Sequence, residues 1–181
     1  MAQRPVTIET ERLLLVVLLP HELEALVAGD AERAGRSAGV DFPPGWPEER
    51  EAREGLFWHL RHLHADTAHI PWRIRLIVER SSRFVVGSIN LKGPPSPDGD
   101  VEIGWGVVEH CRRRGYALEA AAAVAAWVLA QPGVNSLSAT VPSDNGASQR
   151  LAAKLGMTLT SDTRRSLPLW KLKAASLQHE I

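Results

Sequence analysis

Three consecutive arginines, Arg112, Arg113 and Arg114, are followed at once by Gly115. A helix is predicted to begin there, and the N-terminus of a helix carries a partial positive charge of its own. The guanidinium groups therefore repel one another and the helix dipole unless an anion lies among them, where free backbone N–H groups would point at it. Because Gly115 lets the backbone approach closely, the sequence predicts a phosphate or pyrophosphate cradle that ends at Ala117. The alternative is a solvated basic turn.

This turn must be positioned by the segments on either side of it. Apolar residues alternate along 101–107, with Val101, Ile103 and Trp105 on one side, which is the two-residue period of a half-buried strand. After Gly115, small and apolar residues recur at helical spacing as far as Gln131. The sequence thus predicts a strand, a basic turn and a helix in succession.

The remaining segments read as further strands and helices. We expect a strand over 7–19, helices over 20–29 and 47–64, a hairpin of strands over 72–79 and 84–92, a strand over 137–141, a helix over 147–155, and a closing hairpin over 157–161 and 167–173. The segment 31–46 is rich in glycine and proline, and we expect a loop or a broken helix. This order predicts an α/β domain with a mixed sheet. A chain of 181 residues is long enough for one such domain over 1–181.

The pattern Arg112-x-x-Gly115-x-Ala117 resembles the acyl-CoA pyrophosphate loop of the GCN5-related N-acetyltransferases (GNAT). The longer string from Glu102 to Ala120 resembles the subgroup that acetylates ribosomal-protein N-termini, the RimJ/RimL type. This resemblance implies the family's architecture: a mixed, mostly antiparallel sheet, flanked by helices, whose central strands splay apart to admit acetyl-CoA as co-substrate.

The resemblance also implies which residues bind that co-substrate. If the central strand splays after Gly106, the backbone groups of the next three residues lose their partner strand, and the pantetheine amides would replace it. The basic turn would wrap the pyrophosphate, and Asn145 would bond the pantetheine, although a helix N-cap is the alternative for Asn145. The implied cofactor-binding residues are Val107, Val108, Glu109, Arg112, Arg113, Arg114, Gly115, Tyr116, Ala117 and Asn145.

Two residues are candidates for moving protons. Glu102 lies on the glycine side of the central strand, where an amine could approach, and is the candidate general base, acting through water. A strand carboxylate paired with arginine is the alternative. Ser148 stands where this subgroup has a serine considered to protonate the departing thiolate; the alternative is a helix-start residue. The tyrosine that other family members use is replaced by Ala152.

Four histidines, His59, His62, His64 and His69, lie close together in the sequence, and the first two would share a helix face. No carboxylate or cysteine completes a known zinc signature, so we expect no metal. We expect this helix to flank the acceptor groove with its histidines facing solvent or substrate.

The bulk composition excludes several classes of protein. Lys plus Arg and Asp plus Glu both number 21, so the net charge is zero and does not favour a nucleic-acid partner. The apolar run before Pro20 is too short for a membrane span and wrongly flanked for export, and the single cysteine, Cys111, suits a reducing compartment. We therefore expect a cytoplasmic protein without membrane or nucleic-acid partners.

The function implied by the resemblance is acetyl transfer from acetyl-CoA to a primary amine by direct attack, on a small-molecule or peptide acceptor. The alternative is a non-catalytic acyl-CoA or nucleotide-binding module of the same fold, which the missing tyrosine at Ala152 keeps open. Relatives in this family are often dimers, so a homodimer is also implied.

Overall fold

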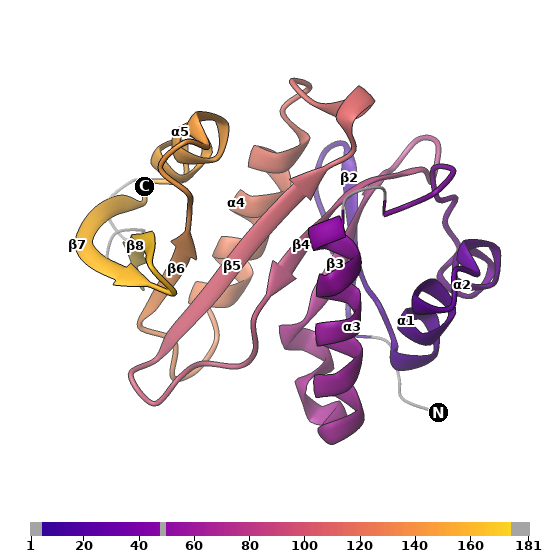
Figure 1. The fold of residues 1–181 in the computed structure, drawn as a ribbon, viewed down its shortest axis with the longest axis horizontal. Helices are drawn as coiled ribbons and strands as arrows, with labels where there is room; N and C mark the ends of the chain where they lie inside the picture. The colour runs from indigo at the N-terminus through magenta and orange to yellow at the C-terminus, as the bar shows by residue number, and fades with distance from the viewer. Residues whose placement is uncertain (1–4, 48–49, 175–181) are drawn as a thin grey trace.

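The computed structural model describes residues 5–47 and 50–174 (Figure 1). The strands are β1 (Ile8–Glu9), β2 (Leu13–Val17), β3 (Ile74–Glu79), β4 (Val85–Leu91), β5 (Asp100–Val107), β6 (Ser136–Thr140), β7 (Thr158–Arg164) and β8 (Leu167–Lys173). The helices are α1 (Pro20–Val27), α2 (Ala31–Ala38), α3 (Arg50–Ala65), α4 (Tyr116–Leu129) and α5 (Gly146–Lys154), with short 3-10 turns at Thr67–Trp72 and Glu109–Cys111. In the described part of the chain, no helix is long and apolar enough to cross a membrane.

The strands form one sheet in the order β1-β2-β3-β4-β5-β6-β8-β7. The β5–β6 pair is parallel and all the other pairs are antiparallel. Helix α4 provides the crossover between the two parallel strands, as a parallel connection requires. The predicted mixed, mostly antiparallel sheet with flanking helices is confirmed.

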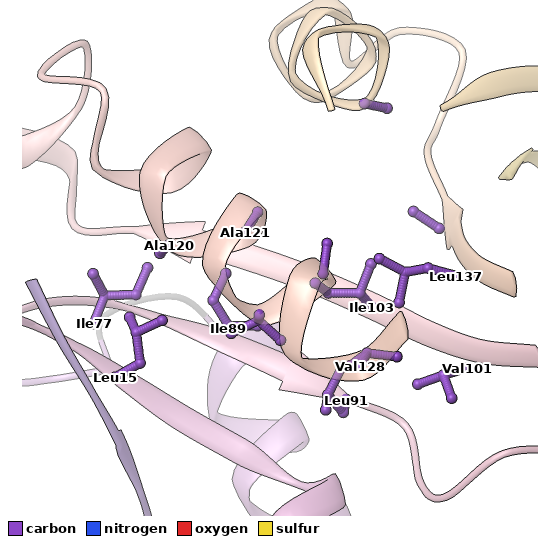
Figure 2. Packing of buried hydrophobic residues seen from close by; sticks show 14 of the residues in the cluster. Leu15, Ile77, Ile89, Leu91, Val101, Ile103, Ala120, Ala121, Val128 and Leu137 are labelled. Atoms are coloured by element: carbon purple, nitrogen blue, oxygen red, sulfur yellow. The ribbon is translucent and has the colours of Figure 1, made fainter. Parts of the chain in front are cut away.

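Each face of the sheet has its own apolar layer. On one face, α4 packs over alternate residues of β2 to β6, and Figure 2 shows Ala120, Ala121 and Val128 of this helix in one apolar layer with residues of the strands, among them Ile77, Ile89, Leu91 and Ile103. The small alanines let this helix sit close to the strands. On the other face, α1 and α3 cover a second apolar cluster. Alternation along β5 therefore sends odd-numbered side chains toward α4 and even-numbered ones toward the α3 side.

The predicted strand over 7–19 is wrong in one respect, because the chain turns back within it. Strands β1 and β2 are antiparallel partners, and the Thr10 N–H donates to the Leu13 carbonyl at 2.9 Å to close the turn. The alternation of apolar residues could not reveal this turn. The turn is stabilised by Glu119, which is distant in the sequence and whose carboxylate accepts a hydrogen bond from the Thr10 hydroxyl at 2.5 Å.

The segments 31–46 and 47–64 fold largely as expected. Helix α2 is the broken helix, started by Asp30, whose side chain accepts from the Arg33 N–H, and ended by Gly39 with φ +68°. Helix α3 begins at Arg50, so the start predicted at Pro47 includes positions 48–49, which lie outside the described residues.

His59 is buried in the packing of α3 against the sheet, so the expectation that the histidines of this helix face solvent or substrate is wrong for it. Asn90 approaches the ring, but neither ring nitrogen makes a hydrogen bond of normal geometry. Burial, followed by repulsion from Lys92 and Arg73, lowers the pKa of His59 from 6.5 to about 3. The described residues contain no group of three or more side chains that could hold a metal ion.

The buried neutral His59 makes stability depend on pH. The unfolded chain binds a proton here below pH 6.5 while the folded chain does not until about pH 3. Stability therefore falls with decreasing pH in this window, with a contribution of about 1.4 kcal/mol per pH unit. Urea unfolding across the window should show this slope in the wild type and a shallower one in His59→Gln. Replacement of the exposed His110 by Gln should keep the wild-type slope, and equal slopes for all three proteins would contradict the prediction.

Candidate functional site

Strands β5 and β6 run side by side for only three residue pairs, and then they part. The last pair is Glu102 with Ser138, whereas β5 remains paired with β4 as far as Val107 with Gly87. The predicted splay is therefore present, but it begins after Glu102 rather than after Gly106. Figure 1 shows β5 continuing well past the end of β6. Beyond Glu102, one long side of β5 has no neighbouring strand.

The alternation of backbone groups shows which of them face this open side. The Glu102 carbonyl accepts from Lys92 N–H and the Val108 N–H donates to the Val86 carbonyl, both at 2.9 Å, so the even-numbered groups of β5 face β4. Because neighbouring residues alternate, Trp105 and Val107 direct their N–H and C=O groups away from β4. The expectation that Val108 loses its partner is thus wrong for its N–H. The Val107 carbonyl accepts from Arg112 Nε at 2.9 Å.

The turn between β5 and α4 presents a run of backbone donors. Its chain takes left-handed conformations at Arg113 (φ +63°) and Gly115 (φ +82°), and the first helical bond is from Glu119 N–H to the Gly115 carbonyl at 3.1 Å. The six N–H groups from Arg113 to Leu118 donate to no acceptor among the residues that the structure describes. Successive donors of this kind, at a helix N-terminus, form an anion-binding concavity.

A network around Arg12 fixes the position of this turn. The Arg12 guanidinium contacts Glu119 at 2.6 and 2.7 Å and donates to the Arg114 carbonyl at 3.0 Å. It also lies over the Tyr116 ring, 5.0 Å from its centroid. The sequence analysis assigned Arg12 no role. Its partners lie more than 100 positions away, and no local pattern signals them.

Tyr116 is buried below the same turn. Its hydroxyl donates to Glu79 at 2.5 Å, and this hydrogen bond raises the pKa of Tyr116 and lowers that of Glu79. The phenol therefore keeps its proton at neutral pH and ties the start of α4 to the end of β3.

At the other edge of the gap, the start of α5 meets the free part of β5. The Asn145 side chain accepts from the Ser148 N–H at 3.0 Å, which makes it the N-cap of α5. The Trp105 indole donates to the Ser148 hydroxyl oxygen at 3.3 Å. Because that oxygen accepts from Trp105, its own hydrogen is available for a further acceptor. The structure thus brings Ser148 to the parted strands.

Glu102 is engaged by two arginines from the β7–β8 hairpin. Its side chain is 7% exposed and contacts Arg164 at 3.0 Å and Arg165, while Thr140 donates to it at 3.1 Å. The hairpin turns through Arg165 and Ser166, both with positive φ, which is the geometry of a tight two-residue turn. The sequence analysis placed both arginines in a loop and gave them no role.

Asp100 lies beside Glu102 on the buried part of the β5–β6 pair. Burial alone would raise the pKa of Asp100, but Ser136, Ser138 and Arg164 donate to it at 2.6, 2.6 and 2.9 Å, so its pKa is lowered. The Asp100 carboxylate is therefore held in its ionised form.

An open groove runs along the free part of β5. A Cβ atom built on Gly104 or Gly106 would meet nothing within 4 Å, so space lies above the strand on the α3 side, next to Glu102. A small pocket continues beyond it. Its walls include Trp46, Ala52, Ser88, Gly106 and Glu109. Open space therefore lies along β5 between the position of Glu102 and the pocket beside Glu109.

Comparisons with known proteins find relatives of this chain in sequence and in fold. Residues 12–158 match the family model described as an acetyltransferase (GNAT) domain. The chain is 29% identical over 154 residues to the protein named "Uncharacterized N-acetyltransferase YjdG" of Bacillus subtilis (strain 168), covering 85% of this chain and 90% of that one.

Two solved structures share the fold. An acetyltransferase from Agrobacterium tumefaciens str. C58 superposes with a TM-score of 0.65 at 23% identity, over 95% of this chain and 96% of that one. RimL, a ribosomal L7/L12 alpha-N-protein acetyltransferase solved with coenzyme A, gives 0.61 at 14% identity over 93% and 98%. The family model matches most of the length of this chain, and the central strands of its sheet part. This chain therefore belongs to the GNAT acetyltransferase family and is an N-acetyltransferase.

Proposed function

We propose that the protein transfers the acetyl group of acetyl-CoA to a primary amine by direct attack, with no acyl-enzyme. The parted strands carry this proposal, because they leave backbone donors open in the place where the family's co-substrate would need them. The reaction requires little more than positioning, stabilisation of an oxyanion and movement of two protons.

The donor half of the site is the turn from Arg112 to Ala117 together with the free edge of β5. The open N–H groups of the turn suit a diphosphate, to which the arginine side chains add charge. The backbone groups of Trp105 and Val107 suit the amides of a pantetheine arm, which would add to the sheet as a strand does. A backbone N–H of this stretch would stabilise the oxyanion.

In the acceptor half, Glu102 serves as the general base. An ammonium group must lose a proton before its nitrogen can attack, and Glu102 is a carboxylate of β5 next to the open groove. Its contact with Arg165, a side chain 57% exposed, is the one that an incoming amine can replace, while the more buried Arg164 stays in place. Water then carries the proton to solvent.

Ser148 is the candidate acid for the departing thiolate. Attack of the nitrogen on the carbonyl carbon forms the amide as the carbon–sulfur bond breaks, and the sulfur leaves with the electron pair. The Ser148 hydroxyl, oriented by Trp105, would give that sulfur a proton and regain one, through water, from the second N–H that the attacking nitrogen loses. Asn145 caps α5 and leaves its amide NH₂ available to a pantetheine carbonyl.

The competing function is a binding module that holds acyl-CoA without turnover. Thiol release from acetyl-CoA, measured with a panel of primary amines, separates the two. We expect release with at least one amine, and a kcat about 100-fold lower in Ser148→Ala at unchanged KM for acetyl-CoA, in the range typical of general acids. The exposed Ser143, in the turn just before α5, should keep wild-type kcat when it is changed to Ala. Tight binding of acetyl-CoA without thiol release on any amine would contradict the proposal.

Arg12 should control binding of the diphosphate through the turn that it holds. We expect Arg12→Gln to weaken CoA binding about tenfold in calorimetry, because charged hydrogen bonds of this kind contribute about 1.5–3 kcal/mol each. Binding of pantetheine, which lacks the diphosphate, should not change. Arg80, a similarly exposed arginine paired with Glu9 at 3.2 Å, provides the matched control as Arg80→Gln. Equal losses for CoA and pantetheine would assign Arg12 a purely structural role.

A further inference from the structure

The Glu102 end of the groove carries more positive than negative charge. Four cationic side chains surround the two carboxylates, Asp100 and Glu102. They are Lys92, Arg164, Arg165 and Lys171. Arg164 bridges both carboxylates, at 2.9 and 3.0 Å, and Arg165 contacts Glu102 alone. Two positive charges therefore have no carboxylate of their own in this cluster.

The α3 side of the groove adds a further cation. Arg73 is 3% exposed and Lys92 lies beside it, with Arg73 Nη1 donating to the Lys92 carbonyl at 3.3 Å. Both charged groups lie over the Trp58 ring, 5.1 and 5.4 Å from its centroid. Neither forms an ion pair with a carboxylate of the described chain, and Arg73 Nε has no hydrogen-bond partner.

The surroundings disfavour the charged form of both side chains. Desolvation lowers the pKa of Lys92, although this side chain is exposed and Glu102 attracts it, and burial lowers the pKa of Arg73 against an attraction to Asp66. Stacking on an aromatic face compensates a cation only in part. An anion placed between Lys92 and Arg165 would compensate both cations directly.

The contact between Glu102 and Arg165 limits which amine acceptors can bind. An amine that reaches Glu102 must displace Arg165, and if the acceptor brings only positive charge, the excess at this end of the groove grows. Arg165, which is 57% exposed, then loses its carboxylate partner and adds to the excess of positive charge. An acceptor that also carries an anionic group provides a new partner for both Glu102 and Arg165, because its ammonium group binds Glu102 and its anionic group binds Arg165.

Resting on the proposed function, we infer that the acceptor is a primary amine that carries a carboxylate or phosphate group, bound through Glu102 at its ammonium end and through Lys92 and Arg165 at its anionic end. This assigns Lys92 and Arg165 as specificity determinants. Amines whose other end is cationic, such as diamines, are poor acceptors by the same reasoning.

The test compares short ω-amino acids with the ω-amino amides and diamines of the same length, and with aminoalkyl phosphates to identify the anion. We expect kcat/KM for the preferred anionic acceptor to exceed that for the amide at least about tenfold, the effect of one hydrogen-bonded charge, with the diamine lowest. This preference should shrink as ionic strength rises.

Single substitutions test which side chains cause the preference for an anionic acceptor. Lys92→Gln and Arg165→Gln should each bring the ratio of anionic acceptor to amide toward one at unchanged affinity for acetyl-CoA. Lys154→Gln, at an exposed position of α5, should leave the ratio as in the wild type. Equal rates for acid, amide and diamine would overturn the inference and leave the proposed transferase function standing.

If no amine releases CoA, the proposed function fails, and the inference is then tested by binding. The same acceptors are titrated into the protein–CoA complex by calorimetry. Tighter binding of the anionic acceptor, lost in Arg165→Gln, supports the anionic subsite without catalysis. Equal binding of acid and amide overturns it.

Discussion

The site depends on a single backbone constraint, which is that β5 keeps its neighbour on one side and loses it on the other. Polar backbone groups in a folded protein need partners, and the edge of a strand is a template for another extended segment. Here β6 leaves after Ser138 and continues with β8, where Thr140 pairs with Leu169. The free edge of β5 is thereby placed between two helices, where an extended ligand can complete the sheet.

Side chains hold the two halves of this opening in place. On one side, Arg12, Glu119 and Tyr116 fix the turn that starts α4 to the N-terminal strands. On the other side, the Trp105 indole reaches Ser148 at the start of α5. Both elements that we propose to bind the donor are thus positioned by contacts between residues far apart in the chain.

Local patterns predicted the elements but not their long-range contacts. The alternation along β5, the cap at Asn145 and the basic turn before α4 are all visible in the sequence because each is decided by neighbouring residues. The point of separation was misjudged because it depends on where β6 ends, and no residue in β5 marks that position.

The acceptor side was the least predictable part. Arg164 and Arg165 meet Glu102 across more than 60 positions because the β7–β8 hairpin turns back over the sheet, and a loop with two arginines gives no sign of this. His59 was misplaced for a related reason: one helix carries His59 on its buried side and His64 on its exposed side. A cluster in sequence was not a cluster in space.

The central claim is that the open backbone of β5 and of the turn before α4 holds the acyl donor, and amide NMR tests it most directly. On titration with CoA, we predict that the N–H signals of residues 113–118 and those of Trp105 and Val107 shift together. Pantetheine alone should move only the two β5 signals. Saturable CoA binding that leaves both sets of amides unmoved would contradict the account.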